Sequence, residues 1–125
     1  MLQPDDTVPN FDVMSVGGER LHYSSIWQRK NLVLVMLPDL DSPSRNYADA
    51  LMAHAGGSND DTTWLVTRER IRGVPCPGVV VADRWGEIAY VAAPPRIEDL
   101  PTPDELLAWV EYLEHRCPEC EGEAR

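Results

Sequence analysis

The chain has 125 residues, a length that suits one domain with a single hydrophobic core. Its 21 acidic side chains outnumber its 11 lysines and arginines, and the net charge of -10 repels phosphate backbones, which excludes nucleic-acid binding. No stretch approaches the roughly 18 consecutive apolar residues of a membrane span, and the opening MLQPDDTVPN has neither the basic nor the apolar region of a signal peptide. We therefore expect a cytoplasmic protein that does not bind membranes.

The first half of the chain predicts a hairpin, a buried strand and a helix. Gly17-Gly18 forms a turn between strands near residues 11–15 and 20–23. The run NLVLVMLP follows and has no polar face, so we expect a central strand over 32–37 that is buried on both sides. Ser42 then resembles an N-cap with Pro43 at the first helical position. After that helix, TTWLVT predicts a second short buried strand.

The second half predicts a hairpin and a closing helix. In GVVVADRWGEIAYVA, two β-rich runs flank a turn over residues 84–86. Thr102 resembles an N-cap, Pro103 suits the first helical position, and Glu105 completes a capping box. An apolar stripe follows, and the helix is expected to end near His115. A right-handed crossover would make strands 32–37 and 62–67 parallel, which gives a mixed α/β fold.

This order of elements resembles the thioredoxin-like superfamily. The segment IRGVPCPGVVVADRWGEI is similar to the part of that fold in which Gly-Val-Pro precedes a strand, a turn and a Gly-Glu-Ile strand. In the family the proline of this segment is cis. The resemblance therefore implies that Pro75 is the cis-proline, with Val74 beside it.

The N-terminal half resembles the peroxiredoxin and redoxin branch. The strings VPNFDV, GGERLHYSSIW and NLVLVMLPDLDSP follow one another as in the opening of those proteins, and the likeness covers roughly residues 4–115. It implies a thioredoxin-like fold with a mixed central sheet, an N-terminal β-hairpin and flanking helices. We expect residues 1–116 to form this domain and residues 117–125 to form an acidic tail.

The family's active-site thiols are missing from the expected place. A helix N-terminus stabilises a thiolate there, but the chain reads LPDLDSPSRNY. The thioredoxin pattern puts Asp41 and Ser44 where cysteines would be, and the peroxiredoxin pattern puts Ser44 near the peroxidatic position. A serine cannot form a sulfenic acid with peroxide. Arg45 is either the counterpart of the arginine that assists peroxidatic cysteines or a surface arginine of the helix.

Thiol chemistry is then left to three cysteines. Cys76 directly follows Pro75 and is either a nucleophile or resolving thiol, or a small buried hydrophobe. Cys117 and Cys120 form a C-x-x-C in RCPECEGEAR. This pair follows a helix C-terminus and is crowded by acidic residues, so its surroundings disfavour a thiolate, and its disulfide should be comparatively hard to reduce.

Three functions follow from these residues. The first is a thiol-disulfide redox protein of the redoxin type, without a cofactor, that acts through Cys117, Cys120 and Cys76. The second is a non-catalytic module that binds a protein or peptide partner in a groove between Ser44 and Pro75. The third is a zinc-bridged homodimer, because His115, Cys117 and Cys120 are zinc-compatible ligands but a closed site needs four.

Overall fold

The centre of the computed structural model, which describes residues 2–39, 41–55 and 61–115, is a four-stranded mixed sheet. The spatial order is β4-β3-β5-β6. β3 runs parallel to β4, as predicted, and antiparallel to β5, which pairs antiparallel with β6. The strands are β3 (Asn31–Met36), β4 (Thr62–Thr67), β5 (Gly78–Ala82) and β6 (Ile88–Ala92).

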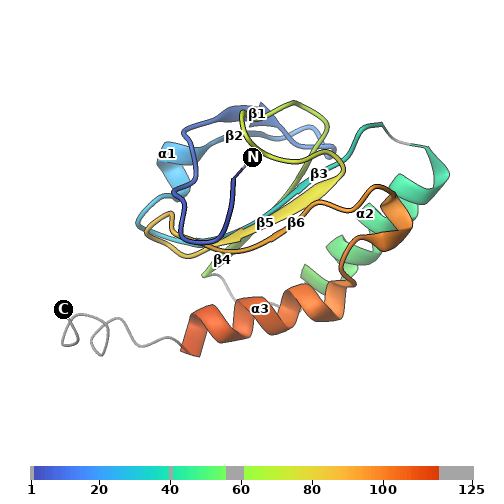
Figure 1. The fold of residues 1–125 in the computed structure, drawn as a ribbon. Helices are drawn as coiled ribbons and strands as arrows, with labels where there is room; N and C mark the ends of the chain where they lie inside the picture. The colour runs from blue at the N-terminus through green and yellow to red at the C-terminus, as the bar shows by residue number, and fades with distance from the viewer. Residues whose placement is uncertain (1, 40, 56–60, 116–125) are drawn as a thin grey trace.

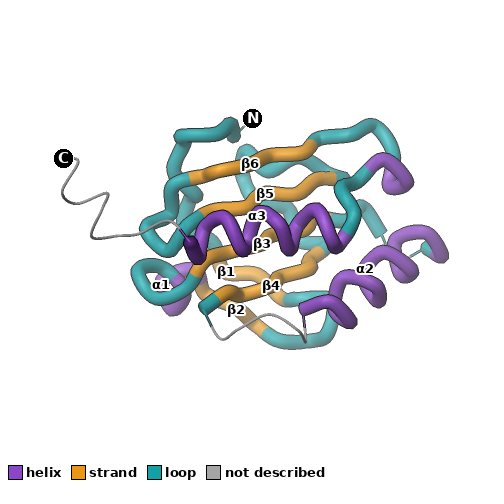
Figure 2. The backbone as a smooth tube through the Cα atoms, turned by 90° about the horizontal axis from the view of Figure 1, so that it is seen from below, coloured by secondary structure: helices purple, strands orange, loops and turns teal. Residues whose placement is uncertain are grey.

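Two layers cover this sheet, one on each face (Figure 1). The N-terminal hairpin and a short helix cover one face, and two longer helices cover the other. Seen from below, α3 crosses the middle of the sheet and α2 lies beside it (Figure 2). The predicted α/β architecture with an N-terminal hairpin and flanking helices is confirmed. The covering elements are β1 (Asp12–Met14), β2 (Arg20–His22), α1 (Tyr23–Ile26), α2 (Ser42–Ala55), the 3-10 turn η1 (Ile97–Asp99) and α3 (Pro103–His115).

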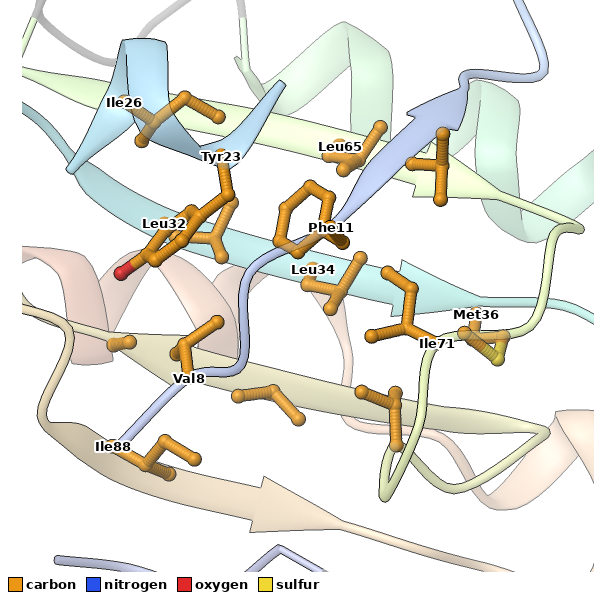
Figure 3. Packing of buried hydrophobic residues seen from close by; sticks show 14 residues of the cluster. Val8, Phe11, Tyr23, Ile26, Leu32, Leu34, Met36, Leu65, Ile71 and Ile88 are labelled. Atoms are coloured by element: carbon orange, nitrogen blue, oxygen red, sulfur yellow. The ribbon is translucent and has the colours of Figure 1, made fainter. Parts of the chain in front are cut away.

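β3 separates two hydrophobic clusters because its side chains alternate between the faces of the sheet. Every residue of β3 is buried, as predicted for a central strand. Leu32, Leu34 and Met36 join the cluster on the hairpin side, where Phe11 stacks on Tyr23 at 5.1 Å between ring centroids (Figure 3). Val33, Val35 and Leu37 join the cluster under α2 and α3. The strand therefore fixes both layers at once.

The helix starts agree with the sequence at α3 and differ at α2. At α3 the backbone N–H of Glu105 donates to the Thr102 hydroxyl at 3.1 Å, which confirms Thr102 as the N-cap. At α2 the helix already includes Ser42, and the capping side chain is Asp41. The prediction of Ser42 as the cap is wrong by one residue, because Asp41, which is also a favoured N-cap residue, accepts the N–H of Ser44 three positions on.

Two tryptophans, Trp27 and Trp85, are partly exposed. Trp27 and Trp85 remain 45% and 48% exposed at the end of α1 and in the β5–β6 turn. The Trp27 indole N–H donates to the Trp85 carbonyl at 3.1 Å, so the two residues tie α1 to that turn. None of the helices described here combines the length and the apolarity that crossing a membrane requires.

Candidate functional site

The position where the thioredoxin pattern expects its thiols lies at one end of the sheet. Met36, the last residue of β3, pairs with Gly78, the first residue of β5, and the N–H of Leu37 donates to the Thr67 carbonyl at 3.0 Å. The ends of β3 and β4, the start of β5 and the loops that continue them therefore meet here. α2 begins five residues after Leu37, at the same end (Figure 1).

Asp41 occupies the N-terminus of α2. Its carboxylate accepts a hydrogen bond from the backbone N–H of Ser44 at 3.0 Å, and its carbonyl accepts one from the N–H of Arg45 at 2.9 Å. Its own N–H donates to the Asp39 carboxylate at 2.9 Å. The bond from the Ser44 backbone holds the pKa of Asp41 below its usual range. The helix end that would stabilise a thiolate in this fold thus carries a carboxylate of the chain itself.

The two neighbours of this cap face different surroundings. The Ser44 side chain is fully buried. Arg45 is exposed on the first turn of α2. The start of the helix therefore carries an anion at its tip (Asp41), a buried hydroxyl behind it (Ser44) and a cationic side chain at the surface (Arg45).

The Pro75 loop differs from the expectation in its peptide geometry. The cis peptide bond joins Cys76 to Pro77, so the prediction of a cis bond at Pro75 is wrong by two residues. Pro77 is the residue directly before β5. The turn is tight, because a Cβ at Gly78 would overlap the carbonyl oxygen of Pro75. Val74 is buried beneath it.

Cys76 and α2 lie at the same end of the sheet but pack in different layers. Cys76 is half-buried and packs against the cluster on the hairpin side, together with Val74. The residues of α2 that enter the core, Ala48 and Leu51, belong to the cluster on the other face. Cys76 is a free thiol and the one cysteine within the described residues.

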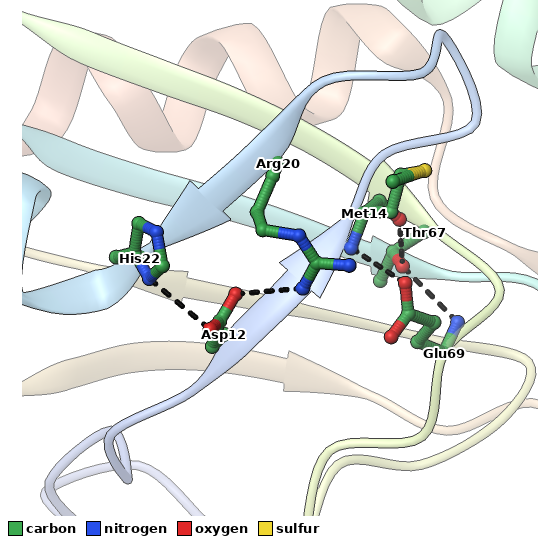
Figure 4. A network of polar contacts seen from close by, with 6 residues as sticks. All are labelled: Asp12, Met14, Arg20, His22, Thr67 and Glu69. Carbon is green, nitrogen blue, oxygen red and sulfur yellow. Dashed lines mark hydrogen bonds and ion pairs between the residues drawn. The ribbon is translucent and has the colours of Figure 1, made fainter.

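A polar network that sequence reasoning missed closes the same end of the sheet (Figure 4). The Thr67 hydroxyl donates to the Met14 carbonyl at 2.8 Å and accepts the N–H of Glu69 at 3.1 Å. The Glu69 carboxylate accepts the N–H of Met14 at 2.6 Å. These bonds lock the hairpin to the end of β4. Residues 14 and 69 are far apart in the chain, so no local sequence pattern predicts their contact.

On the outer side of the hairpin, the Asp12 carboxylate contacts two neighbouring side chains. Asp12 pairs with Arg20 at 2.9 Å and with His22 at 3.2 Å across β1 and β2. All three side chains are about half exposed, so this contact contributes little to stability. His22 is thus a surface residue of the hairpin.

The remaining predicted site residues lie at or beyond the end of α3. His115 is exposed in the last turn of that helix. Cys117 and Cys120 fall outside the described residues, and so does the boundary between the expected domain and its tail. Among residues 2–39, 41–55 and 61–115, no three histidine, cysteine or acidic side chains converge as metal ligands would.

Comparisons with known proteins place the fold. No protein-family model and no curated protein matches the sequence. Among solved structures, a peroxiredoxin-like protein from Aquifex aeolicus superposes with a TM-score of 0.66 at 18% identity, over 90% of this chain and 88% of that one. The mitochondrial 2-Cys peroxiredoxin of Plasmodium falciparum gives 0.65 at 10% identity, over 90% and 95%.

A third structure comes from the disulfide-exchange side of the superfamily. A thiol:disulfide interchange protein of the thioredoxin family from Chlorobium tepidum TLS superposes with a TM-score of 0.62 at 14% identity, over 90% of this chain and 98% of that one. The chain spans nearly the whole length of all three structures. It therefore has the thioredoxin-like fold that peroxiredoxins and thiol-disulfide interchange proteins share.

Proposed function

We propose that this chain is a thiol-disulfide redox protein whose working dithiol is the Cys117–Cys120 pair. The observation that supports this is the start of α2. There the Asp41 carboxylate accepts the Ser44 N–H where the fold usually presents a thiol. Neither a carboxylate nor a serine hydroxyl undergoes two-electron thiol chemistry. The C-x-x-C at residues 117–120 is the remaining dithiol of this spacing in the sequence.

The proposed reaction is a disulfide exchange in two steps. The thiolate of one cysteine of the pair attacks a sulfur of the substrate disulfide and displaces a substrate thiolate, which leaves a mixed disulfide. The second cysteine loses its proton and attacks the mixed disulfide, which releases the second substrate thiolate. The substrate gains two electrons, and Cys117 and Cys120 become a disulfide. A small dithiol or a reductase returns the pair to its reduced form.

The position of α3 supports a reaction centre away from the start of α2. α3 runs back across the sheet and ends at His115, at the opposite end of the sheet from the start of α2 (Figures 1 and 2). Cys117 follows two residues later in the sequence. A dithiol that reacts near His115 does not use the N-terminus of α2, so its turnover should not depend on Asp41.

Reduction of insulin by dithiothreitol, with and without the protein, tests this function. We expect catalysed turnover that is lost in Cys117→Ser and in Cys120→Ser. Cys76 was also a candidate thiol, but it is half-buried against the hairpin-side cluster, so the matched control Cys76→Ser should keep turnover. Turnover equal to buffer in the unaltered protein would overturn the proposal. Turnover that persists in Cys117→Ser would also overturn it, because the reaction would then use other groups.

Two alternative functions are distinguished from the redox function by the native mass of the protein. A non-catalytic module would bind a protein or peptide partner between Ser44 and Pro75, and the absence of a thiol from the start of α2 favours it. A zinc-bridged homodimer would use His115, Cys117 and Cys120. The native mass, measured before and after reduction, shows a gain of two hydrogens for the redox protein and bound zinc for the bridged dimer. If the purified protein already has the mass of the reduced, metal-free chain and this mass does not change on reduction, the binding module is the function that remains.

A further inference from the structure

A hollow of about 620 Å³ lies beside the edge of the sheet, away from the start of α2. Three segments that are far apart in the sequence form it. The N-terminal segment contributes Asp5, the first residue of β6 and the residue before it contribute Ile88 and Glu87, and α3 contributes Trp109 and Tyr112. None of the predicted functional residues lines it.

The aromatic side of this hollow is held in a fixed arrangement. Trp109 stacks on Tyr90 of β6, with 4.9 Å between ring centroids and 23° between the planes. Tyr112, one helical turn further on, meets Trp109 edge to face at 5.8 Å and 88°. The Tyr112 side chain is nevertheless 53% exposed. Packing therefore orients these rings while part of their surface stays accessible, and accessible aromatic rings can bind a cation.

The rim of the hollow carries negative charge. Asp5 and Glu87 both line it, and the described residues that line it include no lysine or arginine. Asp5 adopts a left-handed backbone conformation, with φ at 75°, and its N–H donates to the Ile88 carbonyl at 2.8 Å. Such a backbone is uncommon for a residue other than glycine, although aspartate adopts it more often than most residues. Aromatic faces next to carboxylates select guanidinium and ammonium groups.

The strand at this hollow is the outer strand of the sheet. β6 ends the strand order, and the N-terminal segment pairs with its beginning, where the N–H of Ile88 donates to the Asp6 carbonyl at 2.9 Å. In the part of the chain that the structure describes, no strand pairs with the rest of the outer side of β6. An extended peptide can therefore continue along this edge by main-chain hydrogen bonds while one side chain enters the hollow.

We propose that this hollow binds an arginine or lysine side chain of an extended partner peptide that lies along β6. The aromatic pair Trp109 and Tyr112 would contact the cation, and Asp5 and Glu87 would complement its charge. This interaction is separate from the proposed redox reaction, because no cysteine takes part in it.

Binding of a fluorescently labelled peptide, acetyl-Thr-Val-Arg-Val-Thr-amide, to the full chain in reducing buffer tests the proposal. We expect the same peptide with citrulline in place of arginine to bind about fivefold or more weakly, because citrulline keeps the shape and removes the charge. Raising the salt concentration should weaken the arginine peptide more than the citrulline peptide. Equal affinities for the two peptides would overturn the proposal.

Two variants locate the site. Tyr112→Ala should weaken binding by about two- to fivefold, and Asp5→Asn combined with Glu87→Gln should weaken it by about fivefold. Asparagine tolerates the left-handed backbone at position 5. The matched control, Glu98→Gln with Glu111→Gln, removes the same charge from exposed acids that do not line the hollow. An equal loss in this control would overturn the site.

A final binding measurement tests whether the ligand is a peptide. Acetyl-arginine amide carries the same guanidinium group but cannot extend along β6. We expect it to bind more weakly than the peptide, and equal binding would overturn the part assigned to the strand edge. All measurements should give the same result in Cys117→Ser, so a failure of the redox function leaves this proposal intact.

Discussion

The backbone N–H of Ser44 donates to the Asp41 carboxylate at 3.0 Å, so the start of α2 is capped by an anion of its own chain. Asp41→Ala removes that cap, and we expect it to lower the unfolding temperature because the N–H of Ser44 loses its acceptor. Asp41→Asn should keep most of the stability, because asparagine is a comparable cap. Calorimetry on the three proteins checks this order, and equal melting temperatures for the alanine and asparagine variants would contradict it.

The same contact predicts a pH dependence in acid. The pKa of Asp41 is lowered in the folded chain by the Ser44 backbone N–H. Its contribution to stability is therefore fully present above the unfolded pKa of about 4 and is lost as the pH falls through the folded value. Chemical unfolding between pH 6 and 3 should show the loss in the unaltered protein. The loss should be smaller in Asp41→Asn, which has no proton to gain.

Tyr47 and Tyr23 should respond in opposite directions to the loss of their hydroxyl groups. The Tyr47 hydroxyl donates to the Pro101 carbonyl at 2.6 Å and ties α2 to the segment before α3. The Tyr23 hydroxyl is buried and has no hydrogen-bond partner within the described residues. We expect Tyr47→Phe to lower the free energy of unfolding by about 1 kcal/mol and Tyr23→Phe to raise it by a similar amount.

The Tyr23 variant is a clean comparison, because phenylalanine keeps the ring that stacks on Phe11. Urea unfolding at neutral pH measures both variants. A destabilised Tyr23→Phe protein would show that its hydroxyl has a partner after all.

Alkaline pH should destabilise the fold through the same two residues. Burial raises the pKa of Tyr23 to about 12, and it also raises the pKa of Tyr47. The unfolded chain releases these protons near pH 10, whereas the folded chain keeps them. Stability is therefore fully present below about pH 10 and falls as the pH rises from there through the folded values. Urea unfolding at pH 8, 10 and 11 checks this, and combining Tyr23→Phe with Tyr47→Phe should flatten the decline.

The strands and helix starts that local patterns dictate were predictable from the sequence. The apolar run that contains Leu32 and Leu34 has the length of a strand and no polar face, which favours a strand buried on both faces. Thr102 lies three residues before Glu105 in a capping pattern. The cap of α2 was predicted one residue too late, because Asp41 is as good an N-cap residue as Ser42 and proline is tolerated throughout the first turn of a helix.

Features that depend on distant contacts were not predictable. The resemblance put the cis bond at Pro75, whereas it precedes Pro77, two residues further along the same loop. The contact between Glu69 and Met14 joins segments that no local spacing relates. The hollow next to Tyr112 likewise arises from three distant segments, so its parts have no common motif.

The start of α2 should regain thiol chemistry when thiols are placed there. Asp41→Cys combined with Ser44→Cys creates a C-x-x-C at the helix N-terminus, in a background that carries Cys117→Ser and Cys120→Ser. The helix N-terminus and its N–H groups stabilise an anion at position 41, as they now stabilise the Asp41 carboxylate. We expect this variant to reduce insulin with dithiothreitol, and its outer thiol to titrate below the ordinary value of about 8.5.

Single substitutions separate the two thiols. Asp41→Cys alone, in the same background, should react rapidly with iodoacetamide near neutral pH but should not turn over insulin, because no second thiol resolves the mixed disulfide. Ser44→Cys alone should react slowly, because position 44 is fully buried. If the thiol at position 41 alkylates no faster than that of an unfolded cysteine peptide, the start of α2 does not stabilise an anion. The absence of cysteines would then not explain why the start of α2 lacks thiol chemistry.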